Sequence, residues 1–263
     1  MSGDRARQGA LAVLRAVRED DAYANLVAPQ VFHSYGLSGR DAAFATELAY
    51  GTLRWQGWYD AVLTTCVSRS WDRVEPSLRD VLRLGAHQLL AMRVPAHAAV
   101  DSSCDLAREQ GVPAGAKARA GFVNAVLRRV ADRDADAWAQ RLRGDRDEDD
   151  PTWLAERWSH PLWIVRALRD ALGQRRGELA DLLAADNTPA RPSLVARPGR
   201  MSVDALLELP QVGPGRWSPL AATLLDGPPE ALACVREGRV GVQDEGSQLV
   251  ALALARAQAP DGS

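Results

Sequence analysis

The sequence has little cysteine, almost no lysine and no long apolar run. Its three cysteines, Cys66, Cys104 and Cys234, are odd in number and far apart, which argues against a disulfide framework and a CxxC metal knuckle. No apolar stretch approaches the roughly 20 residues that a bilayer-spanning helix needs. The N-terminus also lacks the basic and then apolar order of a secretory signal. We therefore expect a cytoplasmic protein without a membrane or metal partner, and we assign the cysteines to the core.

The basic residues are almost all arginine, because Lys117 is the only lysine. The net charge of -2 provides no overall basic field of the kind that attracts nucleic acid to a whole protein. The distribution is uneven, however. Residues 1–143 carry 19 basic and 16 acidic side chains, residues 144–150 one and five, and residues 151–263 twelve and thirteen. Any RNA-binding charge is therefore expected mainly in the first part.

A chain of 263 residues is long enough for more than one domain. Up to about residue 135 the apolar residues recur at helical spacing, and Pro and Gly mark the breaks. The acidic segment 144–150 begins with glycine, precedes Pro151 and is typical of a solvated linker. Beyond it, tryptophan-rich helical segments give way after Pro189 to short strands and turns. We predict an all-α domain over 1–143, an acidic linker over 144–150 and a small α+β subdomain over 151–238.

Two further patterns give local predictions. Residues 239–243 are predicted to form a strand and 246–256 a helix whose residues Leu249, Leu252 and Ala253 face inward. Residues 213–215 (GPG) are interpreted as a turn and not as a phosphate loop, because proline lacks a backbone donor. The helix from 117 to 133 is predicted to bury Ala118, Phe122, Val126 and Val130 and to expose Lys117, Gly121, Asn124 and Arg128.

Seven segments, in order along the chain, resemble the N-terminal half of the bacterial ribosomal RNA small-subunit methyltransferase B family. The helical domain of that family is similar to the transcription antitermination factor NusB. The segments are residues 41–55 (DAAFATELAYGTLRW), 82–90 (LRLGAHQLL), 93–101 (RVPAHAAVD), 120–129 (AGFVNAVLRR), 158–163 (WSHPLW), 185–189 (ADNTP) and 242–248 (VQDEGSQ).

The resemblance implies a mainly α fold: a NusB-like all-α RNA-binding domain, a small α+β subdomain, and over 239–263 the first strand and helix of a Rossmann-like methyltransferase domain. Such an enzyme uses S-adenosylmethionine to methylate C5 of a cytosine in 16S rRNA. The family's glycine-rich cofactor loop, its acidic ribose-binding residue and both motif cysteines are expected beyond Ser263. No catalytic residue is therefore assigned in this chain, no tight cofactor binding is expected, and we expect the chain alone to be inactive. The stretch after Pro192 departs from the family by lacking an asparagine.

RNA binding by such a domain depends on basic side chains that contact phosphates. Arginines at helical spacing also commonly serve only to solvate a helix face, and the sequence leaves the two interpretations even for each residue. Trp55 and Trp58 are interpreted as packing residues in preference to base-stacking residues. The candidate RNA-binding residues are Arg5 and Arg7 first, and then Arg54, Lys117, Arg119, Arg128 and Arg129.

Two polar sites remain to be assigned. Thr65 and Cys66 resemble the Thr-Cys pair of these enzymes, but they lie in an apolar helical segment, so we assign Cys66 to the core. Gln243 and Asp244 lie where the predicted strand passes into a helix, and the resemblance implies that they border the cofactor and target-base pocket. Helix capping by Asp244 or Ser247 is the alternative, and both interpretations stay open.

Two other functions are compatible with the sequence. The chain could be a stand-alone NusB-like RNA-binding module in transcription antitermination, which binding to a leader RNA together with a ribosomal protein would indicate. It could also be a protein-interaction domain with no RNA role. RNA affinity that is absent or independent of salt would indicate that second function. The sequence identifies no protein partner.

Overall fold

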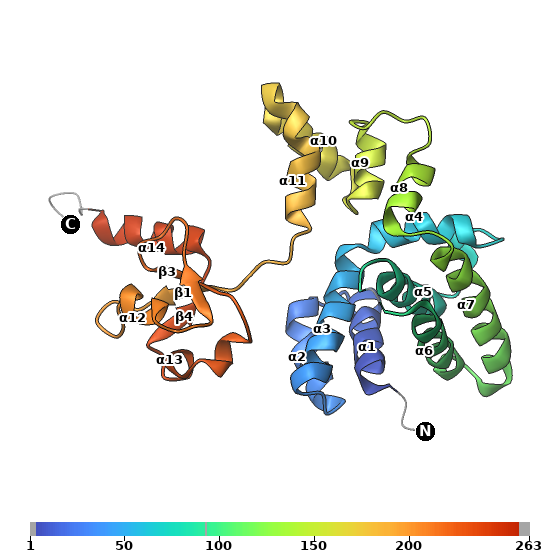
Figure 1. Cartoon of the computed structure of the whole chain (residues 1–263), viewed down its shortest axis with the longest axis horizontal. Helices are drawn as coiled ribbons and strands as arrows, with labels where there is room; N and C mark the ends of the chain where they lie inside the picture. Colours follow the sequence, from blue (N-terminus) through green and yellow to red (C-terminus); the bar gives the residue numbers. More distant parts are fainter. Residues whose placement is uncertain (1–3, 93, 258–263) are drawn as a thin grey trace. The chain divides into compact units, whose positions relative to one another are not determined.

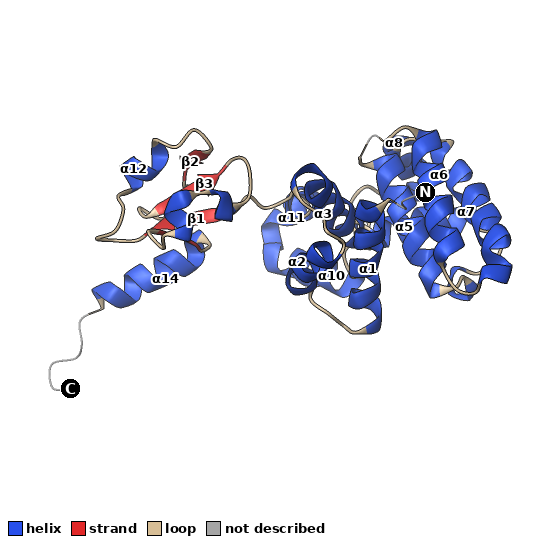
Figure 2. Cartoon of the chain, turned by 90° about the horizontal axis from the view of Figure 1, so that it is seen from below, coloured by secondary structure: helices blue, strands red, loops and turns tan. Residues whose placement is uncertain are grey.

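The computed structural model describes residues 4–92 and 94–257 (Figure 1). The chain divides into two compact units, residues 1–187 and 188–263, which we describe separately. The first unit is built from helices, and the second contains a small sheet (Figure 2). The expected mainly α fold is confirmed. Among the described residues, no helix is long and apolar enough to cross a membrane.

Helix α5 lies at the centre of the first unit. Its residues from Asp80 to Gln88 are all buried, and it packs against α1, α3, α4, α6 and α7. Gly85 permits the close approach of α7, since a Cβ at this position would lie 2.5 Å from Leu127 Cδ1. The helices of the unit are α1 (Arg5–Glu19), α2 (Ala24–Ser34), α3 (Gly39–Arg54), α4 (Gln56–Cys66), α5 (Pro76–Leu90), α6 (Ala96–Glu109), α7 (Ala116–Ala131), α8 (Ala135–Arg143), α9 (Pro151–Arg157), α10 (Leu162–Leu172) and α11 (Leu179–Asp186), with 3₁₀ turns η1 (Trp71–Arg73), η2 (Pro113–Gly115) and η3 (Gly173–Glu178).

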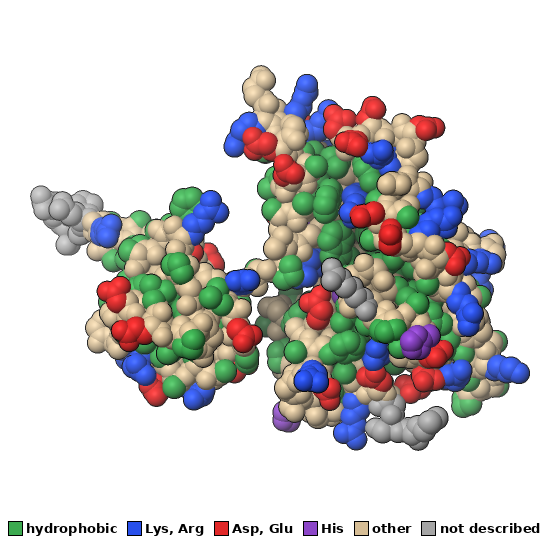
Figure 3. Space-filling view, viewed as in Figure 1, with side chains coloured by type: hydrophobic (Ala, Val, Ile, Leu, Met, Phe, Trp, Pro, Cys, Tyr) green, Lys and Arg blue, Asp and Glu red, His purple; other side chains and the backbone are tan. Residues whose placement is uncertain are grey.

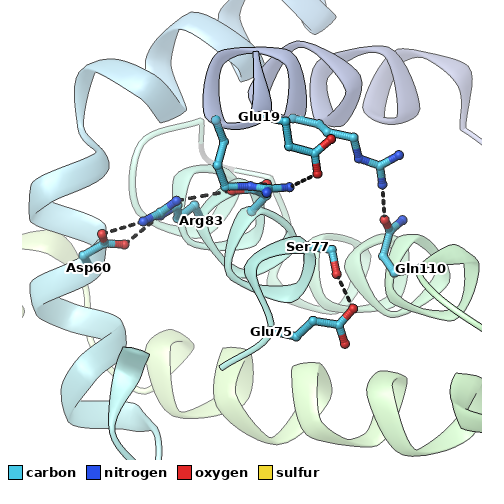
Figure 4. Close-up of polar contacts among 9 residues, drawn as sticks. Glu19, Asp60, Glu75, Ser77, Arg83 and Gln110 are labelled. Carbon is cyan, nitrogen blue, oxygen red and sulfur yellow. Dashed lines mark hydrogen bonds and ion pairs between the residues drawn. The ribbon is translucent and has the colours of Figure 1, made fainter. Parts of the chain in front are cut away.

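A network of buried charges joins three of these helices (Figure 4). The Arg83 guanidinium of α5 donates to both carboxylate oxygens of Asp60 in α4, each at 2.7 Å. It also donates to Asp80 at 3.2 Å, and the second oxygen of Asp80 accepts from Arg18 of α1 at 2.7 Å. Buried ions are tolerated only when they are paired. Arg18 and Arg83 therefore stabilise the fold and are not available to bind a ligand.

Helix α7 corrects one part of the predicted pattern. Its buried residues are Ala120, Val123, Val126, Leu127 and Val130, so the buried stripe is rotated from the one expected. Ala118 is exposed, and Phe122 is only half-buried beneath the guanidinium of Arg69, 4.7 Å from the ring centroid. The predicted stripe followed a strict spacing of four, whereas the helical period of 3.6 moves such a stripe around the helix.

The acidic segment 144–150 is a turn inside the first unit, and the division between the units falls instead at 187/188. Gly144 ends α8 at a φ of 57°. Asp150 then caps α9 by accepting from the backbone amides of Thr152 and Trp153, each at 2.8 Å. Trp153 packs edge-on against Trp58 of α4 with ring centroids 6.4 Å apart, so one hydrophobic core continues across the acidic turn. The composition indicated a solvated segment but not that its flanking helices share a core.

The second unit is a four-stranded antiparallel sheet in the order β2-β3-β1-β4. Strand β4 pairs with β1 in the register Leu194 to Val242, so residues 240–242 belong by their hydrogen bonds to this sheet. The expected turn at 213–215 is mostly the edge strand β2, where proline is tolerated. The elements are β1 (Ser193–Ala196), α12 (Val203–Leu207), β2 (Val212–Pro214), β3 (Ala221–Leu224), η4 (Pro229–Ala231), α13 (Ala233–Arg236), β4 (Val240–Val242) and α14 (Glu245–Arg256).

Helix α14 does not bury the apolar residues that were predicted to face inward. Leu249 is 41% exposed, Ala253 is exposed and Leu252 is half-buried. The buried residue of this helix is Gln248, whose Nε2 donates to the carbonyl oxygens of Leu194 at 3.2 Å and Gln243 at 2.9 Å. A polar side chain thus fixes the start of α14 to the sheet.

Candidate RNA interface

Two of the predicted RNA-binding arginines are used inside the fold. The side chain of Arg7 is only 14% exposed: it forms an ion pair with Asp4, donates to Gln88 Oε1 at 2.7 Å and lies over the ring of Phe44. Arg119 donates to the carbonyl oxygens of Val112 at 2.8 Å and Ala107 at 3.2 Å. The contacts of Arg119 satisfy free carbonyls near the end of α6, and those of Arg7 join α1 to Gln88 and Phe44. A structural role therefore accounts for both arginines.

The other predicted cations lie nearer the surface. Arg5 is exposed on the first turn of α1, and Arg54 is half-buried in the last turn of α3. Arg129 is exposed but donates one bond, of 2.7 Å, to the Cys66 carbonyl oxygen. The structure therefore spreads these three residues over different helices.

Helix α7 brings together Lys117 and Arg128. Both are exposed on one face with Asn124, whose Oδ1 accepts from Arg128 Nε at 3.1 Å. This face borders a hollow of about 680 Å3 between α6 and α7. The hollow is lined by Asp101, Cys104, Asp105, Arg108, Ala116, Lys117, Ala120, Gly121 and Asn124.

A second group of arginines lies around the C-terminal end of α4, where only Arg129 had been predicted. Arg129, Arg133 and Arg141 act electrostatically on the Cys66 thiol. Burial nevertheless dominates and raises the pKa of Cys66, and burial also raises that of Cys104. Both thiols therefore stay protonated at neutral pH, and neither supplies a nucleophile. The sequence could have placed Arg133 and Arg141 beside Arg129 only if it had shown that α7 and α8 pack against α4.

The tryptophans pack inside the first unit, as predicted. Trp58 is 3% exposed, and Trp55 lies against Trp158 with ring centroids 6.1 Å apart. Neither ring presents a free face typical of a base-stacking platform. Among residues 4–92 and 94–257, no group of three or more His, Cys, Asp or Glu side chains could hold a metal ion.

In the second unit, Gln243 is exposed and borders a hollow of about 590 Å3. Asp244 caps α14 by accepting from the amide and hydroxyl of Ser247. Glu245 accepts from the backbone amides of Arg216, Trp217 and Ser218, and these bonds lower its pKa. The hollow is lined by Val195, Arg197, Pro198, Leu220, Gly241, Val242, Gln243, Gln248, Ala251 and Leu252.

This hollow does not fit S-adenosylmethionine. Its lining contains no carboxylate that could bind ribose hydroxyls, and no glycine-rich turn leads from β4 into α14. The first carboxylate after β4, that of Asp244, already caps the helix. This hollow therefore offers no cradle for the cofactor.

Known proteins match the chain along both units. Residues 4–132 match the NusB family. A protein of Mycobacterium tuberculosis named only as a methyltransferase is 48% identical over 251 residues, which cover 95% of this chain and 54% of the relative. Ribosomal RNA small subunit methyltransferase B of Pseudomonas syringae is 33% identical over 221 residues, covering 81% of this chain and 45% of the relative.

The fold also has a solved counterpart. The crystal structure of PH0851 superposes with a TM-score of 0.64 at 17% identity, covering 94% of this chain and 55% of that one. The chain spans about half the length of the curated relatives it matches. Residues 4–132 thus match the NusB family, and the chain as a whole is similar to proteins named as methyltransferases, among them ribosomal RNA small subunit methyltransferase B.

Proposed function

We propose that this chain binds 16S rRNA and positions it for methylation of C5 of a cytosine by an S-adenosylmethionine-dependent methyltransferase of which it forms the RNA-recognition part. The observation that carries the proposal is the extent of the similarity. It runs through both units to a relative named ribosomal RNA small subunit methyltransferase B, and it includes a NusB-family domain.

The surface of the first unit supports RNA binding through a subset of the predicted residues. Lys117 and Arg128 share the exposed face of α7, and Arg5 is exposed on α1. Exposed cations can exchange solvent for phosphate oxygens without disturbing the fold, whereas Arg7 and Arg119 cannot. We therefore assign phosphate contacts to Lys117 and Arg128 first, then to Arg5, Arg54 and Arg129.

The chemistry of the described residues supports a positioning role without catalysis. Attack on C6 of cytosine needs an accessible thiolate, but Cys66, Cys104 and Cys234 are all buried. Together with the hollow that does not fit the cofactor, this supports the proposal that residues 1–263 do not transfer a methyl group alone. Gln243 is exposed beside that hollow and could contact a neighbouring part of the complete enzyme.

The test combines RNA binding with methyl transfer. The purified chain is titrated with 16S rRNA over a series of KCl concentrations and incubated separately with 16S rRNA and labelled S-adenosylmethionine. We expect binding that weakens as salt rises, with no label on the RNA. Label transferred by the chain alone would contradict the positioning role, and the absence of RNA binding would contradict the whole proposal.

Antitermination is the competing function, and one observation disfavours it. The NusB match ends at residue 132, whereas the similarity to methyltransferases covers 95% of the chain in one relative. An antitermination factor would leave the second unit unexplained. If the chain bound a leader RNA together with a ribosomal protein more tightly than it bound 16S rRNA, antitermination would become the favoured function.

A further inference from the structure

Three arginines outside the predicted set converge at the end of α10. Arg166 and Arg169 lie on α10, and Arg176 lies in η3. Gly173, at a φ of 54°, provides the left-handed turn that brings η3 back beside the helix. Together with Asp170 and Gly173, the three arginines line a hollow of about 450 Å3. The space-filling view shows Lys and Arg side chains at the top, over α10 and the turn after it (Figure 3).

These guanidinium groups lack the protein partners that other arginines of the first unit have. Among the described residues, the arginines of α10 and η3 make one ion pair, between Arg175 and Glu178 at 3.8 Å. Arg166, Arg169 and Arg176 have no hydrogen bond or ion pair there, in contrast to Arg83 with its two carboxylates. Three cations around one hollow repel one another, and a phosphate that accepts from several of them relieves that repulsion.

Nearby carboxylates reduce this charge without cancelling it. Asp170 lines the hollow itself. Glu148 and Asp149 line an adjoining hollow of about 440 Å3, which Arg169 and Arg176 also border. Glu148, however, is already paired with Arg143 at 2.6 Å. The excess of positive charge therefore remains on the side of Arg166.

Stabilisation of the helix end explains only part of the cluster. A cation in the last turn of a helix interacts favourably with the negative end of its dipole, which accounts for Arg169. Arg166 lies a turn earlier, and Arg176 lies beyond the helix. A role in ligand binding accounts for all three positions at once.

An exposed tryptophan lies beside the cluster on the same helix. Trp163 is 71% exposed, in contrast to the buried Trp58 and Trp153. It precedes Arg166 by three residues, so the two side chains are neighbours on the helix surface. An exposed aromatic ring beside arginines is the combination that binds unpaired nucleotides, with the base stacked on the ring and the phosphates held by the cations.

We propose that Arg166, Arg169 and Arg176 bind the phosphates of an unpaired RNA segment and that Trp163 stacks on one of its bases. This inference rests on the proposed function, because it places a second contact of the same RNA on α10. The single-stranded character follows from Trp163, since a base stacked inside a duplex offers no free face to an indole ring.

The test uses the full chain and a labelled RNA hairpin with an unpaired loop, followed by fluorescence anisotropy over a KCl series. The triple variant R166Q/R169Q/R176Q should lower the slope of log affinity against log salt by roughly two to three, because each phosphate contact contributes about 0.7 to 0.9. The matched control R40Q/R73Q/R191Q removes the same charge from exposed arginines outside the cluster and should leave the slope unchanged.

The stacking contact is tested with W163A. We expect the affinity of this variant for the looped hairpin to fall at least about fivefold. Its affinity for a full duplex, formed by the same RNA and its complementary strand, should stay unchanged. Circular dichroism of every variant checks that the fold is intact.

The outcomes separate the two proposals. If the wild-type chain binds the hairpin but the triple variant keeps its salt slope, or the control loses as much, the inference about α10 is wrong and the proposed function stands. If the wild-type chain binds neither the hairpin nor 16S rRNA, both are wrong. An equal loss of hairpin and duplex affinity in W163A would contradict the assignment to unpaired RNA.

Discussion

The buried imidazole of His87 determines which residue α3 can carry at position 51. His87 is 1% exposed, and the hydroxyl of Tyr59 lies 2.7 Å from its Nδ1. Burial raises the pKa of Tyr59, so this hydroxyl stays protonated. A Cβ on Gly51 would lie 2.3 Å from both Cε1 and Nε2 of the ring. Because the ring is held in place, only glycine fits there.

We predict that Gly51→Ala lowers the free energy of unfolding. Overpacking of a buried site costs about 1 to 3 kcal/mol, which outweighs the gain of up to about 1 kcal/mol from replacing a helical glycine. The matched control is Gly121→Ala on α7, where nothing lies within 4 Å of the new Cβ. Urea unfolding should show a loss for the first variant and a gain of about 0.5 to 1 kcal/mol for the second. A gain at both positions would show that the His87 ring moves freely.

A second residue-scale prediction separates surface cations from structural ones. K117Q/R128Q should weaken binding to 16S rRNA and reduce the salt slope by about 2, with an unchanged unfolding midpoint. Arg7→Gln should instead lower the unfolding midpoint, because it breaks the contacts with Gln88 and Asp4. Salt-dependent RNA binding and thermal unfolding of the wild type and the two variants distinguish RNA-binding cations from structural ones. The assignment to α7 is wrong if K117Q/R128Q binds like the wild type.

At the scale of elements, one carboxylate links α14 to the loop at 216–218. Glu245 accepts three backbone amides of this loop, and these bonds hold its pKa below the ordinary value of 4.5. A depressed carboxyl pKa adds stability above that value, and this stability is lost as the pH falls through the lower, folded-state pKa.

We therefore predict that acidification to below pH 4.5 lowers the protection factors of the amides of residues 216–218, that is, their protection relative to an unfolded chain at the same pH. Glu245→Gln should produce the same loss of protection at neutral pH, because a neutral amide accepts hydrogen bonds more weakly than a carboxylate. Amide exchange followed by NMR is the measurement. The control is Glu237→Gln, whose carboxylate pairs, among the described residues, only with Arg239. Protection that persists in Glu245→Gln would show that the loop is held by other contacts.

At the scale of the whole molecule, the position of the first boundary can be tested with fragments. Trp153 and Leu154 belong to the same hydrophobic core as Trp58, so the fragment 1–187 should unfold cooperatively. The fragment 1–143 should be less stable by at least about 3 kcal/mol, because loss of a buried tryptophan alone costs 3 to 5. Thermal unfolding followed by circular dichroism compares the two. Equal midpoints would restore the boundary that the acidic composition of 144–150 indicated.

The sequence by itself determined the local features of this protein. The helical spacing of apolar residues up to about residue 135 predicted the helices of the first unit, and the turn-rich composition after Pro189 predicted the short strands that follow, because both depend on the local sequence. The resemblance of seven segments predicted the NusB-like domain that the comparison with known proteins confirmed. The assignment of the cysteines to the core is also confirmed, because all three are buried.

Only the tertiary structure decided which side chains remain available for binding. Arg7 and Arg128 are both predicted from sequence to bind RNA, yet Arg7 is enclosed by Gln88 and Phe44 and Arg128 is exposed. Likewise, Arg166 and Arg176 meet only because Gly173 turns the chain, and β4 joins β1 across more than forty residues. The physical reason is that periodicity records how residues are arranged along one element, whereas exposure and pairing depend on which distant elements pack against it.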